Sequence, residues 1–147
     1  TNFEGNGLTV EQRDGKVYVS MENKLLFESG SWAVNTRGRE AVMQLGNVLA
    51  ENPEIAVLIE GHTDTIAYSG NGNIKTNWDL STKRATSIVS ILTENTKILK
   101  ENLTAAGRGE FAPIAPNTTS EGRSKNRRIE VILTPKLDEI SKLLNEL

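Results

Sequence analysis

An uninterrupted run of five apolar residues at 55–59 (Ile-Ala-Val-Leu-Ile) constrains the fold of this chain more than any other feature. Strands that are apolar on both faces are typical of the centre of a sheet covered by helices. The run lies between two segments, 36–52 and 78–95, whose apolar residues recur at helical spacing. Helices that connect strands in this way predict a sheet built by crossovers, with its helices on one face.

Shorter segments complete the predicted order of elements. The dipeptide Asp14-Gly15 separates two segments of alternating apolar and polar residues, which strongly favours a tight hairpin. Asn35 or Thr36 could cap the first long helix, and Asn52-Pro53 ends it. The predicted elements are a hairpin of strands 8–13 and 16–21, a strand at 25–27, a helix at 36–52, a strand at 55–59, a helix at 78–95, strands at 103–106 and 129–133, and a helix at 137–147.

Length and composition limit the class of protein. The 147 residues suit a single domain, 1–147. A net charge of -2 argues against generic nucleic-acid binding, and the lack of cysteine rules out disulfides and thiolate metal sites. No apolar stretch approaches the ~18 residues of a membrane helix. Residues 1–5 lack the features of a signal peptide. We therefore expect either the mature form of an exported protein or a piece of a longer exported chain, and we favour the piece.

The segment that ends the central strand, 60–64 (Glu-Gly-His-Thr-Asp), is the first candidate for a binding site. Ligands tend to bind just beyond the carboxyl ends of strands in sheets of alternating strands and helices. Asp64 lies there, after a glycine that would let the chain turn sharply. The alternative is that the Asp64 carboxylate only bonds the backbone of its own loop, which is a common use of aspartate.

Arg84 is the second candidate, because it interrupts the apolar stripe of the helix at 78–95. If Asn77 caps that helix, Arg84 shares a face with Asn77 and points toward the loop that carries Asp64. A buried guanidinium needs an anionic partner. Either Asp64 and Arg84 form a plain salt bridge, or a zwitterionic ligand enters between them, with its ammonium on Asp64 and its carboxylate on Arg84. Spacing alone does not decide between these two arrangements.

Four motifs in order resemble those of OmpA-like domains over residues 17–133. The resemblance rests on Phe27-x-x-Gly30-Ser31, on Glu60-Gly61-His62-Thr63-Asp64, on Asn77-x-x-Leu80-Ser81-x-x-Arg84-Ala85, and on Gly107-x-Gly109 followed by Pro113, 117–119 and 121–130. It implies an α+β fold, a two-layer sandwich of the βαβαβ type with a mixed sheet and helices on one face. The N-terminal hairpin and the helix at 137–147 would be additions to it.

The resemblance also implies a function and a set of binding residues. Domains of this family bind peptidoglycan non-covalently, and the residues matched by Asp64 and Arg84 hold the free amino-acid end of diaminopimelate in the stem peptide. Thr63, Asn77 and Leu80 would line the same pocket. Weaker candidates for ligand contacts are Thr65, Trp78, Phe27 and Arg128, of which Trp78 could stack on a sugar. The expected location is the periplasm of a Gram-negative cell, within a protein attached to the outer membrane or another envelope component.

The chain departs from the family pattern in one loop. Thirteen residues lead from Asp64 to Asn77, where the family usually has about eight, so the insertion at 67–73 is expected to lengthen the rim of the groove. The helix at 137–147 lies beyond the shared pattern and would pack on the domain or mediate pairing. We expect a monomer or a weak dimer.

Other classes of function find less support in the sequence. His62 is the only histidine, whereas catalytic zinc takes three protein ligands, so we expect neither a metal nor a cofactor. No serine lies in a nucleophile-elbow context that His62 could serve. The basic run 123–128 precedes an acidic strand residue and is expected to support the pocket or an ion pair, not nucleic acid. Two alternatives stay open: a periplasmic peptidoglycan hydrolase, and an OmpA-like fold used only for protein–protein interaction.

Overall fold

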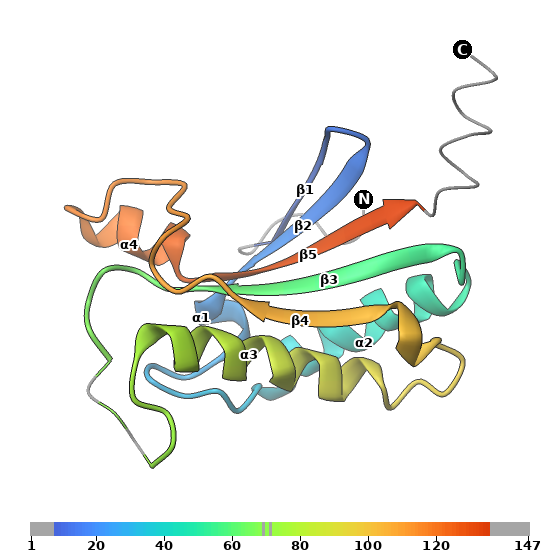
Figure 1. Ribbon diagram of the computed structural model, residues 1–147, viewed down its shortest axis with the longest axis horizontal. Helices are drawn as coiled ribbons and strands as arrows, with labels where there is room; N and C mark the ends of the chain where they lie inside the picture. The colour runs from blue at the N-terminus through green and yellow to red at the C-terminus, as the bar shows by residue number, and fades with distance from the viewer. Residues whose placement is uncertain (1–7, 69, 71, 136–147) are drawn as a thin grey trace.

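The computed structural model describes residues 8–68, 70 and 72–135, and its strands form a five-stranded sheet in the order β1-β2-β5-β3-β4 (Figure 1). The strands are β1 (Leu8–Arg13), β2 (Lys16–Glu22), β3 (Ile55–His62), β4 (Leu103–Gly107) and β5 (Arg128–Pro135). β4 runs parallel to β3, whereas β1 and β2, β2 and β5, and β3 and β5 pair antiparallel. The predicted mixed sheet and N-terminal hairpin are confirmed.

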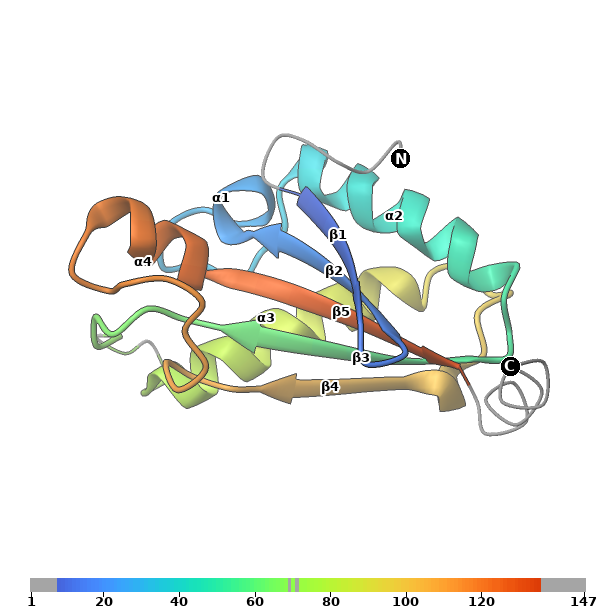
Figure 2. The ribbon, with the colours of Figure 1, turned by 90° about the horizontal axis from the view of Figure 1, so that it is seen from above.

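The two long helices cover one face of this sheet, and among the described residues the other face carries no helix layer (Figures 1 and 2). The helices are α1 (Asn23–Leu26), α2 (Thr36–Ala50), α3 (Asn77–Leu92), the 3-10 turn η1 (Lys100–Asn102) and α4 (Ser120–Asn126). α4 lies at the end of the sheet, beside the point where β3 ends and β5 begins (Figure 2). The predicted two-layer α/β arrangement is therefore confirmed.

Side chains at the start of each long helix fix where it begins. Asn35 caps α2, because its side chain accepts a hydrogen bond from the Gly38 amide at 2.8 Å. Thr76 caps α3 through a capping box with Asp79, so Asn77 is the first helical residue and not the cap that the sequence suggested. This one-residue shift leaves the Asn77 side chain free to contact the neighbouring loop.

The hydrophobic core lies between the sheet and helices α2 and α3. Alternate residues of β3 and β5 point into it, as expected of strands with one face on a core. Its fully buried members include Val42 of α2, Ile88 and Leu92 of α3, Ile59 of β3, and Ile129 and Val131 of β5. The apolar run at 55–59 therefore lies in an interior strand, β3, between β5 and β4, and β3 joins the two helices that the periodicity predicted.

Two short segments differ from the prediction. Residues 23–26 form helix α1 instead of a strand, and Phe27 contributes only an isolated bridge to Val34. Residues 120–126 form α4 where a loop was expected, because the Thr119 hydroxyl caps the amide of Gly122. Neither helix is long enough to show an apolar period. The predicted helix at 137–147 lies outside the described residues.

Gly61 serves a different purpose from the sharp turn expected of it. It lies inside β3, paired with Gly107 of β4, and α3 crosses these two residues. A Cβ atom at Gly61 would overlap the carbonyl oxygen of Ser81, and one at Gly107 would overlap the hydroxyls of Ser81 and Thr82. The two glycines therefore let the backbone of α3 approach the sheet closely.

Within the described part of the chain, no helix is both long enough and apolar enough to cross a membrane.

Candidate ligand-binding groove

A groove of about 610 Å³ opens at the end of the sheet where β3 ends and β5 begins. Four stretches that are far apart in sequence meet there: α1 with the loop after it, the loop after β3, the first two turns of α3, and the residue before β5. The lining residues include Phe27, Gly30, Thr63, Asp64, Ile66, Ala67, Tyr68, Asn77, Leu80, Arg84 and Arg127. The sheet order thus brings the first three predicted motifs to a common cavity.

Asp64 supplies the negative charge of the groove. It is 5% exposed, and its carboxylate accepts hydrogen bonds from the Ile66 amide at 2.9 Å and from Arg127 Nη1 at 2.6 Å. An ionised carboxylate has about four acceptor positions, so both oxygens can still accept a bond from a ligand. The loop-backbone bond is therefore present, but it uses only part of what Asp64 offers.

Arg84 is buried beside the groove without an ion-pair partner among the described residues. It is 5% exposed, its Nε donates to the carbonyl of Ser31 at 2.8 Å, and its guanidinium lies 5.2 Å from the centre of the Phe27 ring. Burial, followed by the charge of the nearby Arg127, lowers the pKa of Arg84 to about 10 against the opposing effects of Tyr68 and Asp64. The guanidinium is still protonated at neutral pH.

Arg127 is the groove residue that the sequence did not single out. Its guanidinium pairs with Asp64, which excludes the plain Asp64–Arg84 salt bridge as the resting arrangement. It is the last residue before β5, at the C-cap of α4. The basic run 123–128 predicts that an arginine supports the pocket, and Arg128 was the expected residue. Because side chains alternate along a strand, Arg128 points elsewhere.

The remaining predicted residues divide into two groups. Thr63, Asn77, Leu80 and Phe27 line the groove together with Asp64 and Arg84, whereas Thr65, Trp78 and Arg128 are not among its lining residues. Asn77 ties the helix to the rim, because its Nδ2 donates to the carbonyls of Ile66 at 3.0 Å and Asp64 at 3.4 Å. The insertion contributes Ala67 and Tyr68 to the wall.

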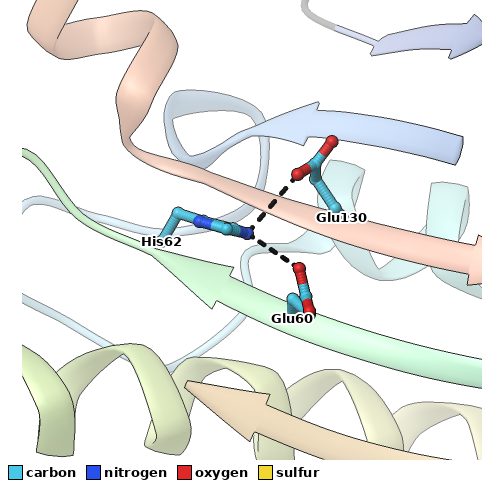
Figure 3. Close-up of side chains that lie close together, drawn as sticks. All are labelled: Glu60, His62 and Glu130. Atoms are coloured by element: carbon cyan, nitrogen blue, oxygen red, sulfur yellow. Dashed lines mark hydrogen bonds and ion pairs between the residues drawn. The ribbon is translucent and has the colours of Figure 1, made fainter. Parts of the chain in front are cut away.

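A separate charged cluster lies on the sheet face away from the helices (Figure 3). His62 Nε2 lies 3.2 Å from Glu60 Oε1 and 3.4 Å from Glu130 Oε2, so one ring nitrogen joins β3 to β5. No hydrogen-bond partner reaches Nδ1 within the part of the chain that the structure describes. His62 therefore orders the end of β3 through its Nε2 atom.

Guanidinium groups already neutralise the carboxylates of this cluster. Arg128 is 3% exposed and lies 3.2 Å from Glu130, and Arg108 lies 3.7 Å from Glu60. The hydrogen bond with His62, followed by the charges of His62, Arg108 and Arg128, lowers the pKa of Glu60 against the effect of burial. Ligand atoms of Glu60, His62 and Glu130 lie within 4.8 Å of one another, a spacing that could also hold a metal ion. We interpret the three residues as part of an ion-pair network that stabilises the strands next to the groove.

The fold and the groove define the class of protein: a two-layer α/β domain with a charged cavity at one end of a mixed sheet. The chain belongs to the OmpA family, whose profile matches residues 26–127. Motility protein B of Bacillus subtilis (strain 168) is 36% identical over 118 residues, which are 80% of this chain and 45% of that protein. The chain spans about half the length of the curated relatives it matches.

Solved structures share the fold over most of the chain. The periplasmic domain of Helicobacter pylori MotB superposes with a TM-score of 0.82 at 25% identity, over 96% of this chain and 90% of that one. The cell wall anchor of the T6SS from Pseudomonas aeruginosa gives a TM-score of 0.80 at 28% identity, over 88% of this chain and 89% of that one. The expected βαβαβ-type fold is confirmed.

Proposed function

We propose that this domain binds peptidoglycan non-covalently and so anchors a protein of the cell envelope to the wall. The ligand group is the zwitterionic end of diaminopimelate in the stem peptide, with its ammonium on Asp64 and its carboxylate on Arg84. Phe27, Thr63, Asn77 and Leu80 form the walls around it. The proposal treats residues 1–147 as one domain that lies in the periplasm and belongs to a longer, membrane-attached chain.

The observation that carries the proposal is the buried, unpaired charge of Arg84. An isolated guanidinium in a largely desolvated position is costly, and its lowered pKa reflects that cost. A carboxylate that enters the groove would supply the missing partner. Arg84 can offer a planar fork of donors to it, an arrangement that suits a carboxylate better than a single ammonium does.

Arg127 sets the charge balance of the groove. Asp64 is paired with Arg127, and the charge of Arg127 lowers the pKa of the neighbouring Arg84, so the two guanidiniums repel each other inside the groove, whereas Lys24 and Glu28 lie at its exposed edge. A ligand carboxylate near both would relieve this repulsion. A lone amine would compete with Arg127 for Asp64 and leave the repulsion in place. The groove therefore favours a ligand that carries a carboxylate beside its ammonium.

The comparisons support the coarser part of the proposal. The chain belongs to the OmpA family, and a structure 28% identical to it is described as the cell wall anchor of a secretion system. Diaminopimelate as the group recognised, and each residue role given above, rest on the groove and on the motif resemblance.

Calorimetry with three matched peptides tests the ligand chemistry. The peptides carry meso-diaminopimelate, lysine, or diaminopimelate with its free carboxylate amidated. We expect the lysine peptide to bind at least roughly a hundredfold more weakly, because a site built around polar partners strongly rejects an analogue that lacks one of them. The amidated peptide should be almost as weak. Equal affinity for the lysine form would mean that Arg84 is structural.

A turnover assay separates this binding module from the alternative of a peptidoglycan hydrolase. We expect purified muropeptides to be recovered unchanged after incubation with the domain, at the pH where binding is measured. The appearance of cleaved products, lost again in an Asp64→Asn variant, would replace the proposal by an enzymatic one. A domain that binds neither sacculi nor any of the three peptides would fit the protein-interaction alternative.

A further inference from the structure

Two exposed aromatic side chains stack on each other next to the groove and form an aromatic plate. Trp78 and Phe111 stack with ring centroids 5.0 Å apart and planes at 26°, and they are 51% and 62% exposed. Gly109, which has a positive φ of 58°, lies beneath the pair, and a Cβ there would touch both rings. We propose that this plate is a second subsite, which binds a sugar ring of the glycan strand that bears the stem peptide.

The plate is continuous with the groove through two direct links. Trp78 follows Asn77, which lines the groove, so their Cα atoms are about 3.8 Å apart. On the other side, the Thr63 amide donates to the carbonyl of Gly109 at 2.8 Å, which ties the loop carrying Phe111 to the segment carrying Asp64. The plate therefore lies on segments that adjoin the wall of the groove.

Two amino acids and a lactyl group separate diaminopimelate from the sugar, so in an extended stem peptide the sugar lies at least about 10 Å from the group bound in the groove. The sugar therefore needs a contact surface outside the groove. This inference rests on the proposed function, because it takes the diaminopimelate end to lie in the groove.

The chemistry of the plate suits a sugar better than a protein partner. Aromatic faces carry partial negative charge and attract the C–H groups of a pyranose face. Arg108 and Glu110 precede Phe111 in the same loop, so polar side chains occur in the segment that carries the plate. Two rings provide much less area than the roughly 800 Å² per partner that a stable protein interface buries. The occupant we infer is a single saccharide unit.

Calorimetry with paired ligands tests the subsite: a diaminopimelate tripeptide without sugar, and the same tripeptide on its disaccharide. We expect the sugar to tighten binding to the unaltered domain by roughly three- to tenfold, the range of aromatic stacking contacts. Trp78→Ala and Phe111→Ala should each remove that gain and leave the affinity for the free tripeptide within about twofold. Leu99→Ala, an exposed apolar residue at the other end of the sheet, is the matched control and should change neither affinity.

Tryptophan fluorescence gives a second readout. In a Trp32→Phe background Trp78 is the remaining tryptophan, and its emission should shift with the disaccharide ligand but not with the tripeptide. A sugar gain that survives both aromatic substitutions, or an equal loss of affinity for the two ligands, would overturn the proposal.

Glycan strands stripped of their peptides separate the two proposals. If the tripeptide fails to bind but stripped strands bind through Trp78, the proposed function is wrong about diaminopimelate and the sugar subsite stands. If the tripeptide binds and the sugar adds nothing, the subsite is wrong and the proposed function stands.

Discussion

Replacing Arg84 by methionine should separate binding from stability. The lowering of the pKa of Arg84 to about 10 corresponds to about 3 kcal/mol of unfavourable free energy for the buried charge, at about 1.4 kcal/mol for each pKa unit. Methionine fills a similar volume without that cost. It also gives up the hydrogen bond to the Ser31 carbonyl, about 1.5–3 kcal/mol for a charged donor, and the contact with the Phe27 ring.

These contributions nearly cancel, so we expect the free energy of unfolding of Arg84→Met to lie within about 1 kcal/mol of the original value. Binding to purified sacculi should weaken by about 2–5 kcal/mol, the cost of removing one partner of a desolvated charge pair. Arg84→Ala should weaken binding by a similar amount and lose more stability, because it leaves a cavity. Urea unfolding followed by circular dichroism measures the stability, and calorimetry with the diaminopimelate peptide measures the binding.

Lys83→Met is the matched control, since Lys83 is exposed on the same helix and lies outside the groove. It should alter neither quantity beyond about 0.5 kcal/mol. Two results would refute the reasoning. A destabilisation of about 3–5 kcal/mol in Arg84→Met would indicate a buried ion pair within the folded chain. Unchanged binding in a folded variant would show that Arg84 does not contact the ligand.

Three further predictions follow from the geometry. The ionised Glu60 carboxylate, whose pKa is lowered in the folded chain, stabilises the fold above pH ~4.5. This stabilisation is lost as the pH falls through the folded pKa, so Glu60→Gln should flatten the acid side of a stability–pH curve. An unchanged acid slope would contradict this. Gly61→Ala should cost at least about 1–3 kcal/mol through overlap with Ser81, whereas Gly46→Ala in α2, with room for a Cβ, should be neutral or stabilising in thermal melts. Deleting residues 69–73 should keep the fold and leave the affinity for the peptide within roughly tenfold, because surface loops tolerate changes in length. Loss of binding in a stable variant would show that these residues belong to the binding site.

The order of the long elements was predictable from the sequence because each buries a large apolar face. The pattern around Ile59 and Ile88 indicated a central strand and a covering helix, and the interrupted stripe at Arg84 indicated a polar group aimed at the strand end. Both features depend on the local spacing of apolar residues, and this spacing already indicates which side of a helix or strand is buried in the folded chain.

The missed features depend on contacts between distant segments or on very short ones. The pairing of Arg127 with Asp64 spans 63 residues and depends on how the end of α4 places Arg127 just before β5 begins. α1 and α4 have four and seven residues, too few to display a helical period, so only the Thr119 cap marked α4. Alternation along β5, applied from the core residue Ile129, would have sent Arg128 to the face opposite the core.

The contact at Gly61 also affects how freely this chain can change its sequence. Asp64 follows β3 and Arg84 belongs to α3, and the two elements touch backbone to backbone at Gly61 and Ser81, with no side chain between them. The spacing between the carboxylate and the guanidinium is therefore fixed by main-chain atoms, which every sequence shares. Substitutions in the hydrophobic core can accumulate without moving the two charges relative to each other. Gly61, its neighbour Gly107 and the two charged residues are therefore the positions where a substitution would disturb this spacing most directly.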